Sequence, residues 1–202
     1  GGEAEWVTQC VEASIAAHAG AMEIWAREGR KHEWAHTQHA LASAWMAMPT
    51  SNIDERRAIL ERVVEGYRLA LEVRSKSKRP AEWAATQHSL AHALVQLGGD
   101  RDVMLLREAL VCYENALTVR TKKRSVIDWA RSEAGLAHAM TLIKVGARNR
   151  HLSDAINRLN AVLAELRAER FARVRRPFEL WLEDAKSKLD KNCGDVKLAD
   201  GA

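Results

Sequence analysis

The sequence predicts an all-α protein, a right-handed superhelical solenoid of antiparallel helix pairs with about eight helices. Two observations predict this fold class. Hydrophobic residues make up 47% of the 202 positions, and Ala, Leu, Glu and Arg are abundant, which favours helices over strands. In addition, a segment that opens with Trp-Ala and continues to a Leu-Ala pair occurs three times at nearly fixed intervals.

The repeat is measurable when the chain is compared with itself. At an offset of 46, residues 60–97 match residues 106–143 at 13 of 38 positions. At an offset of 49, residues 18–48 match residues 67–97 at 12 of 31 positions. The offset changes because the connection "MPTSNIDE" is longer than the connection "GGDRD".

Each repeat is predicted to contain two helices. The first helices are expected over residues 32–48, 80–97 and 126–145, because their apolar residues recur at helical spacing and Gly or Pro follows. The second helix of a repeat carries Tyr67 or Tyr113 and ends in a basic run. Residues 4–28 are expected to form one long helix, residues 151–173 another, and the segment from Arg176 a degenerate capping helix.

We therefore expect residues 1–202 to form a single solenoid. Its predicted parts are an N-terminal half repeat (1–31), a repeat (32–79), a second repeat (80–125), a degenerate repeat (126–176), and a C-terminal capping helix and tail (177–202).

Two pairs of segments carry a resemblance to a known family. "AEWAATQHSLAHAL" with "ERVVEGYRLALEVR", and "IDWARSEAGLAHAM" with "REALVCYENALTVR", resemble the tetratricopeptide repeat (TPR) family in its longer bacterial form, in which a repeat reads "DWAxTQxxLGxAL". The chain departs from that form in two ways. Ala42, Ala91 and Ala137 stand where glycine usually follows leucine, and histidine replaces asparagine at several groove positions.

The resemblance implies that the first helix of each repeat lines a concave groove in which a partner binds. The family's groove positions, carried onto this sequence, place histidines in a column down one face. The predicted partner-binding residues are His36, His39, Ser43, Met46, His88, His92, Arg131 and His138.

The predicted function is a non-catalytic protein–protein interaction module, a scaffold or regulatory segment of a larger protein or complex that binds a peptide or helix of a partner. No phosphate-cradling glycine loop, nucleophile elbow or paired carboxylates indicate catalysis, and no cofactor is expected. The three cysteines form no CxxC pair, and neither a signal peptide nor a membrane-spanning run is visible, so a cytoplasmic location is expected. A bacterial source is what the resemblance implies. Trp25 and Trp45 are candidate partner contacts if they are exposed.

Three alternatives stay open on the sequence alone. His88 and His92 are spaced i, i+4 and are weak candidates for a metal or haem site, although they have no acidic or cysteine partner nearby. Another domain or copy of the protein could fill the groove. Nucleic acid could bind a basic edge, although the net charge is only +4. The residues of this predicted basic edge are Arg74, Lys76, Lys78, Arg79, Arg120, Lys122, Lys123 and Arg124.

Overall fold

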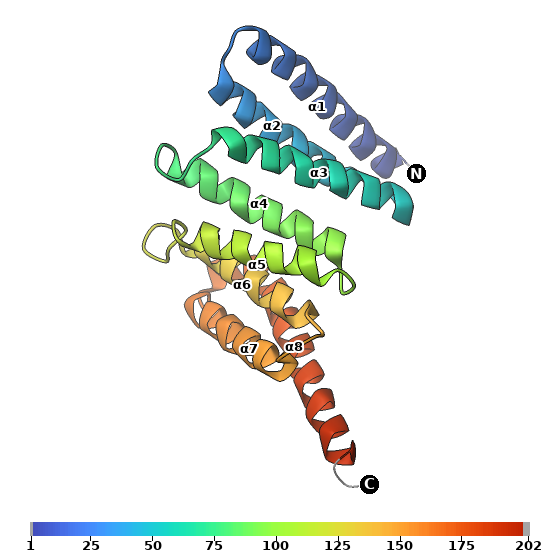
Figure 1. Cartoon of the computed structure of the whole chain (residues 1–202), viewed down its shortest axis with the longest axis vertical. Coiled ribbons are helices and arrows are strands. Elements are labelled where there is room, and N and C mark those ends of the chain that lie inside the picture. Colours follow the sequence, from blue (N-terminus) through green and yellow to red (C-terminus); the bar gives the residue numbers. More distant parts are fainter. Residues whose placement is uncertain (1, 200–202) are drawn as a thin grey trace. The chain divides into compact units, whose positions relative to one another are not determined.

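The computed structural model describes residues 2–199, with side chains over residues 5–192. Helices account for all regular structure in this range, and it contains no strand (Figure 1). The elements in chain order are α1 (Gly2–Arg27), α2 (Lys31–Met46), α3 (Ile53–Val73), α4 (Pro80–Gly98), α5 (Val103–Leu117), α6 (Val126–Leu142), α7 (Arg148–Glu165), the short 3-10 helix η1 (Glu169–Phe171) and α8 (Ala172–Ala199).

The chain divides into two compact units, Gly1–Leu97 and Gly98–Ala202. In the first unit, α2 packs against both α1 and α3, and side chains of α2 and α3 hydrogen-bond to α4. In the second unit, α6 packs against α5 and α7, and α8 packs against α7. Within each unit consecutive helices run in opposite directions (Figure 1), which is the predicted arrangement of antiparallel helix pairs.

Polar caps and glycines set the helix boundaries. The Asn52 side chain accepts hydrogen bonds from the Asp54 and Glu55 amides at 2.9 and 3.0 Å, and Asp102 and Ser125 cap α5 and α6 in the same manner. Gly29, Gly99 and Gly146 take positive φ angles in the connections that follow α1, α4 and α6, a conformation that costs glycine least.

The three predicted first helices are confirmed, with no end more than three residues from its predicted position, whereas one predicted helix is wrong. Residues 151–173 do not form a single helix, because α7 ends at Glu165 and the backbone leaves the helical region at Leu166 and Ala168. Leu166 is fully buried at this turn and shares a core with Phe178 and Leu182 of α8. The turn therefore brings the apolar face of α8 back onto α7.

The tyrosines of the second helices fill the space between neighbouring helices. The Tyr67 hydroxyl lies 3.0 Å from the Ser43 hydroxyl of α2. In the second unit Tyr113 lies directly over Gly135 of α6, where a Cβ atom would be 2.5 Å from the ring. Only a glycine leaves room for Tyr113 at this position.

One interhelical hydrogen bond occurs three times at equivalent positions. The Trp25 indole donates to the Thr37 hydroxyl at 3.1 Å, Arg74 donates to the Thr86 hydroxyl at 2.7 Å, and Arg120 donates to the Ser132 hydroxyl at 3.3 Å. The offsets of 49 and 46 relate these donors and acceptors to one another. In each case a residue within three positions of the end of one helix is fixed to the first half of the next.

The first prediction concerns Gly135. Gly135→Ala should lower the free energy of unfolding by about 1–3 kcal/mol, because the new methyl group overlaps the Tyr113 ring. The cost of this overlap exceeds the stabilisation that alanine brings to a helix relative to glycine. Gly20→Ala is the matched control, since no atom lies within 4 Å of its Cβ position. It should leave stability unchanged or raise it by up to about 1 kcal/mol in urea unfolding. Equal effects of the two substitutions would contradict the packing argument.

The second prediction concerns Arg74. Arg74→Met should destabilise the first unit by about 2–4 kcal/mol, because it removes a buried charged donor. The Thr86 hydroxyl then loses its donor, and the Glu82 carboxylate loses a neighbouring positive charge. The control is Arg57→Met, which breaks only an exposed ion pair with Glu61 and should cost about 0.5 kcal/mol. Urea unfolding followed by tryptophan fluorescence measures both, and a small effect at Arg74 would show that the bond is not structural.

Candidate functional site

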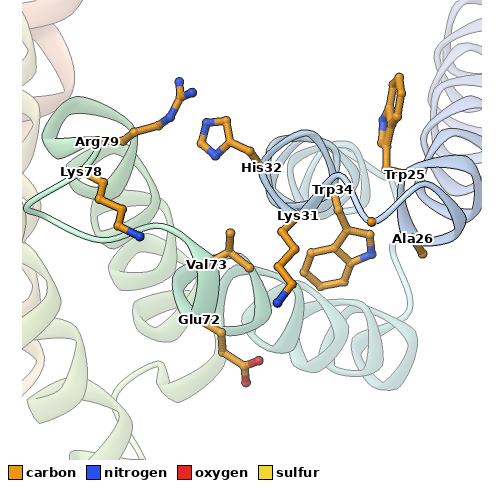
Figure 2. Close-up of a pocket in the computed structure, with 10 residues that line it drawn as sticks. Trp25, Ala26, Lys31, His32, Trp34, Glu72, Val73, Lys78 and Arg79 are labelled. Atoms are coloured by element: carbon orange, nitrogen blue, oxygen red, sulfur yellow. The ribbon is translucent and has the colours of Figure 1, made fainter.

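The first unit has a cleft of about 850 Å³ between the end of α1, the start of α2 and the end of α3 (Figure 2). Two tryptophans and several cationic side chains surround it, and Val73 contributes an apolar wall. The lining residues are Trp25, Ala26, Gly29, Lys31, His32, Trp34, Glu72, Val73, Lys78 and Arg79.

A second, smaller cleft of about 230 Å³ shares Trp25, His32 and Arg79 with the first. It extends along α2 to His36 and reaches Glu82 on α4. The two clefts therefore form one site, which we call the basic cleft. Its smaller part is lined by His32, His36, Arg79 and two carboxylates, those of Glu33 and Glu82.

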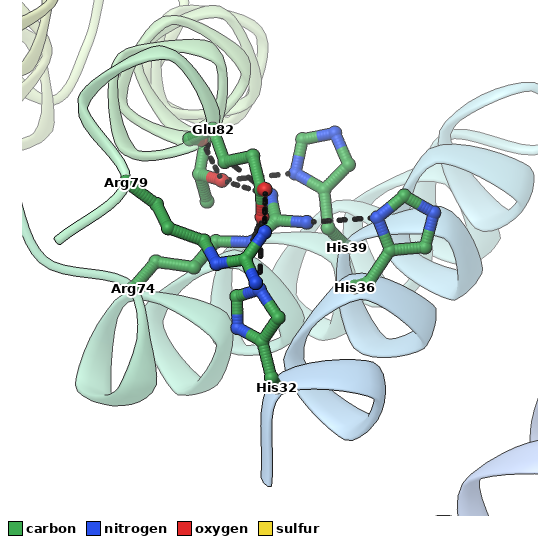
Figure 3. A network of polar contacts seen from close by, with 7 residues as sticks. His32, His36, His39, Arg74, Arg79 and Glu82 are labelled. Carbon is green, nitrogen blue, oxygen red and sulfur yellow. Dashed lines mark hydrogen bonds and ion pairs between the residues drawn. The ribbon is translucent and has the colours of Figure 1, made fainter. Parts of the chain in front are cut away.

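Arg74 lies beneath the basic cleft at the centre of a polar network (Figure 3). Its guanidinium donates to the Thr86 hydroxyl at 2.7 Å, lies 3.3 Å from Nδ1 of His36 and lies 3.6 Å from the Glu82 carboxylate. Thr86 Oγ1 also lies 3.2 Å from Nδ1 of His39. The network therefore ties the end of α3 to both α2 and α4.

Glu82 is the carboxylate of this network. Arg79 donates to it at 2.9 Å, and Nε2 of His32 lies 3.7 Å away. Burial opposes its ionisation, but the hydrogen bond from Arg79 and the charges of Arg74, Arg79 and His32 outweigh burial and lower the pKa of Glu82. Glu82 therefore remains ionised and holds the neighbouring cations in place.

Two lysines at the mouth of the cleft, unlike Arg79 and His32, are not held by a carboxylate. Lys31 and Lys78 are exposed, and within the described part of the chain neither forms an ion pair (Figure 2). Burial lowers the pKa of Arg74 only from the high ordinary value of arginine, so its guanidinium also keeps its charge near neutral pH. The wider cleft is therefore lined by three cations, Lys31, Lys78 and Arg79, and by one carboxylate, that of Glu72, so positive charge is in excess there.

The structure brings together only part of the predicted groove. His36 and His39 join the Arg74 network, and Ser43 donates to the His39 carbonyl at 2.9 Å. Met46 and Gln96 both contact Arg56 of α3, and Gln96 in turn lies 3.2 Å from Nε2 of the exposed His92. His88 is half-buried.

Two predicted groove residues lie in the second unit. Arg131 is exposed on α6. The His138 imidazole is stacked on the Trp181 ring of α8, with centroids 4.4 Å apart and planes inclined by 12°. Trp181 therefore covers one face of the His138 imidazole, and that face is not open to a partner.

The predicted basic edge is interrupted. Arg74 was expected on this edge, but it is only 4% exposed because its guanidinium is used inside the fold. Arg120 is half-buried on Ser132, and Lys76 and Lys122 lie over the rings of Trp83 and Trp129. Lys78, Arg79, Lys123 and Arg124 are exposed as expected.

The sequence analysis also raised the questions of a metal site and of a membrane-spanning helix, and the described residues bear on both. In that range no group of three or more His, Cys, Asp or Glu side chains is arranged to hold a metal ion, and His88 and His92 belong to no such group. No described helix is long and apolar enough to span a bilayer.

His32, Glu82 and Thr86 belong to the site but were not predicted from the sequence. A signal for Thr86 existed, because Thr37, Thr86 and Ser132 recur at the offsets of 49 and 46 together with Trp25, Arg74 and Arg120. A hydroxyl and a donor that recur together predict a contact. His32 and Glu82 gave no such signal, because their proximity depends on how α2 and α4 lie side by side.

Comparisons with known proteins bear on the fold. No protein-family model matches the chain, and no curated protein matches it. Among solved structures, it is similar to the crystal structure of a putative kinesin light chain with nearly identical TPR-like repeats from Podosopora anserina. The two share a TM-score of 0.66 and 20% sequence identity, over 98% of this chain and 88% of that one.

At this level of identity the likeness concerns the fold alone. It agrees with the consecutive antiparallel helices and with the all-helical repeat that the sequence predicted, but it does not identify the bacterial subtype of the motif. The chain has a TPR-like helical repeat fold.

Proposed function

We propose that the protein is an interaction module whose first unit binds an acidic segment of a partner protein in the basic cleft. TPR-like folds generally mediate protein–protein interactions and are typically non-enzymatic. The observation that carries the proposal is the pairing of two tryptophans with unpaired lysines in one cleft. We assign no catalytic role to any residue.

The charged mouth supports recognition of carboxylates. Lys31 and Lys78 have no internal partner to release, so an incoming acidic side chain can pair with them without breaking an existing ion pair. Arg79 and His32 border the same cleft, but Glu82 already engages both. We therefore expect Lys31 and Lys78 to contribute most to the attraction of the acidic segment. Arg79 and His32 are expected to orient it once it is bound.

The tryptophan end supports an apolar anchor. Trp34 and Val73 line the wider cleft, and Trp25 lines both clefts with its indole nitrogen fixed on Thr37. A rigid aromatic wall loses little entropy when a partner side chain packs against it. The fitting sequence is thus an acidic stretch with one large apolar residue.

We place the continuation of the partner along α2 and α4, past His36, His39, Ser43, Met46, His88 and His92, as the sequence resemblance implies. Partial desolvation and the nearby Arg56 charge lower the pKa of His92, so this imidazole is neutral near pH 7 and can exchange hydrogen bonds with a peptide. Arg131, exposed in the second unit, is a further proposed contact; His138, stacked on Trp181, is a weaker one.

The test is a matched pair of charge reversals. Lys31→Glu with Lys78→Glu should abolish capture of acidic peptides from a peptide array, with at least a ~10-fold loss of affinity for the best binders. Arg57→Glu with Arg101→Glu changes the net charge equally at exposed positions outside the cleft and should retain binding. Wild-type binding should also weaken as salt rises from about 50 to 300 mM.

Helix content measured by circular dichroism should be the same for both double variants. If both variants lose binding equally, the attraction comes from net charge and not from the basic cleft. If both retain it, the acidic segment does not bind there.

A further inference from the structure

Two connections of the second unit lie side by side at one end of that unit (Figure 1). Residues 118–125 join α5 to α6, and residues 165–176 lead from the end of α7 through η1 into α8. Lys122 Nζ lies 2.7 Å from the Glu165 carboxylate, which joins the two connections directly. Lys122 also lies over the ring of Trp129, which shares a buried core with residues of α7 and α8. The two connections therefore form one surface.

This surface carries far more positive than negative charge. The two connections contain nine lysines and arginines but only two carboxylates, those of Glu165 and Glu169. Lys122 engages Glu165, and two of the arginines share Glu179 of α8. The other cations that are exposed form no ion pair within the described part of the chain. This arginine corner comprises Lys123, Arg124, Arg167, Arg170 and Arg173.

The stability of the fold does not account for this charge. The basic runs that follow α3 and α5 stand at the ends of those helices, where the helix dipole favours cations. Arg173, by contrast, lies in the first turn of α8, and no acidic residue accompanies it there. At an exposed site of this kind the dipole disfavours a cation by about 0.3–1 kcal/mol, and the neighbouring like charges repel one another. A bound anion removes both costs.

The chemistry of the arginine corner favours phosphate groups as its ligand. All of its cations except Lys123 are arginines, whose planar guanidinium can donate two hydrogen bonds to one phosphate. The aromatic rings of this surface already carry cations, since Lys122 lies over Trp129 and Arg170 lies 4.8 Å from the centre of the Phe171 ring. The corner thus offers charge without the tryptophan wall of the basic cleft. Such a surface suits a polymer that presents a phosphate at every residue.

We propose that the arginine corner binds the phosphate backbone of a nucleic acid without reading its base sequence. Contacts to phosphates alone position a protein on a nucleic acid and carry no sequence information. The proposal does not depend on the proposed function, because the basic cleft lies in the first unit and shares no residue with the arginine corner.

Fluorescence anisotropy of a labelled, mixed-sequence DNA duplex of about 20 base pairs tests this surface. The wild-type chain should bind the duplex at about 50 mM salt. The logarithm of the association constant should fall against the logarithm of salt concentration with a slope of about −4, because the cations of the corner replace condensed counterions. A duplex of unrelated sequence should bind with the same affinity within about twofold.

A triple variant locates the binding. Arg124→Gln with Arg167→Gln and Arg173→Gln should weaken duplex binding at least ~10-fold at about 50 mM salt. It should also reduce the slope to about −2, since two cations of the corner remain.

The matched control removes the same charge from the second unit outside the two connections. Arg101→Gln with Arg107→Gln and Lys186→Gln changes three exposed cations and should retain duplex binding. Helix content measured by circular dichroism should match the wild type for both triple variants, because every substituted side chain is exposed.

A carboxylate polymer separates a nucleic-acid surface from a surface for acidic proteins. Polyglutamate with as many charges as the duplex should displace the labelled duplex at least ~10-fold less effectively than unlabelled duplex. The reason is charge density, since duplex DNA carries one charge per ~1.7 Å of its axis and releases more condensed counterions.

Each remaining outcome overturns the proposal. Absence of binding at about 50 mM salt, or equal losses in the two triple variants, would mean that the arginine corner holds no nucleic acid. Equal competition by polyglutamate would assign the corner to acidic proteins. Lys31→Glu with Lys78→Glu, which tests the basic cleft, should retain duplex binding, so the two surfaces can fail independently.

Discussion

The repeat is held in register by one hydrogen bond, in which a donor at the end of one helix reaches a hydroxyl in the first half of the next. The hydroxyl has two functions in the two later repeats, since Thr86 and Ser132 also donate to the carbonyl four residues earlier. It thereby accepts the interhelical bond with a fixed orientation. The donor changes from tryptophan at Trp25 to arginine at Arg74 and Arg120, but the geometry persists. Alanine side chains are small, so packing through them does little to fix the alignment of two helices. The interhelical hydrogen bond fixes that alignment instead.

This bond also determines which charges remain at the surface. A buried arginine requires a partner, and Glu82 provides it for Arg74 while also holding Arg79. Of the histidines of α2, His36 lies against the same guanidinium, whereas His39 lies against the Thr86 hydroxyl and His32 against the Glu82 carboxylate. What looks in sequence like a uniform basic run is thus divided by depth, with arginine used inside the fold and lysines left at the mouth of the basic cleft. The distinction follows from chemistry, because arginine has several donors in a plane and lysine has one strongly hydrated charge.

Two surfaces of the first unit come from different parts of the same repeat. One is the junction at which a helix ends and the next begins, where tryptophan and basic residues are concentrated. The other is the packing face of α1, where small residues recur because neighbouring helices of an array approach closely there. In the second unit, His138 is stacked on Trp181 and Lys122 pairs with Glu165.

The amino-acid sequence by itself determined the fold class, the repeat offsets and the position of the first helices, because periodic apolar residues and the Gly and Pro stops are local signals. It also marked Trp25 and His36 as residues of interest. It did not reveal that Arg74 is buried or that His32 and Glu82 meet, and it misplaced the end of α7. These features depend on how α2, α3 and α4 lie against one another, and on where Phe178 can bury its ring. Only the tertiary structure decided them, because a side chain's depth and partners are set by residues distant in the chain.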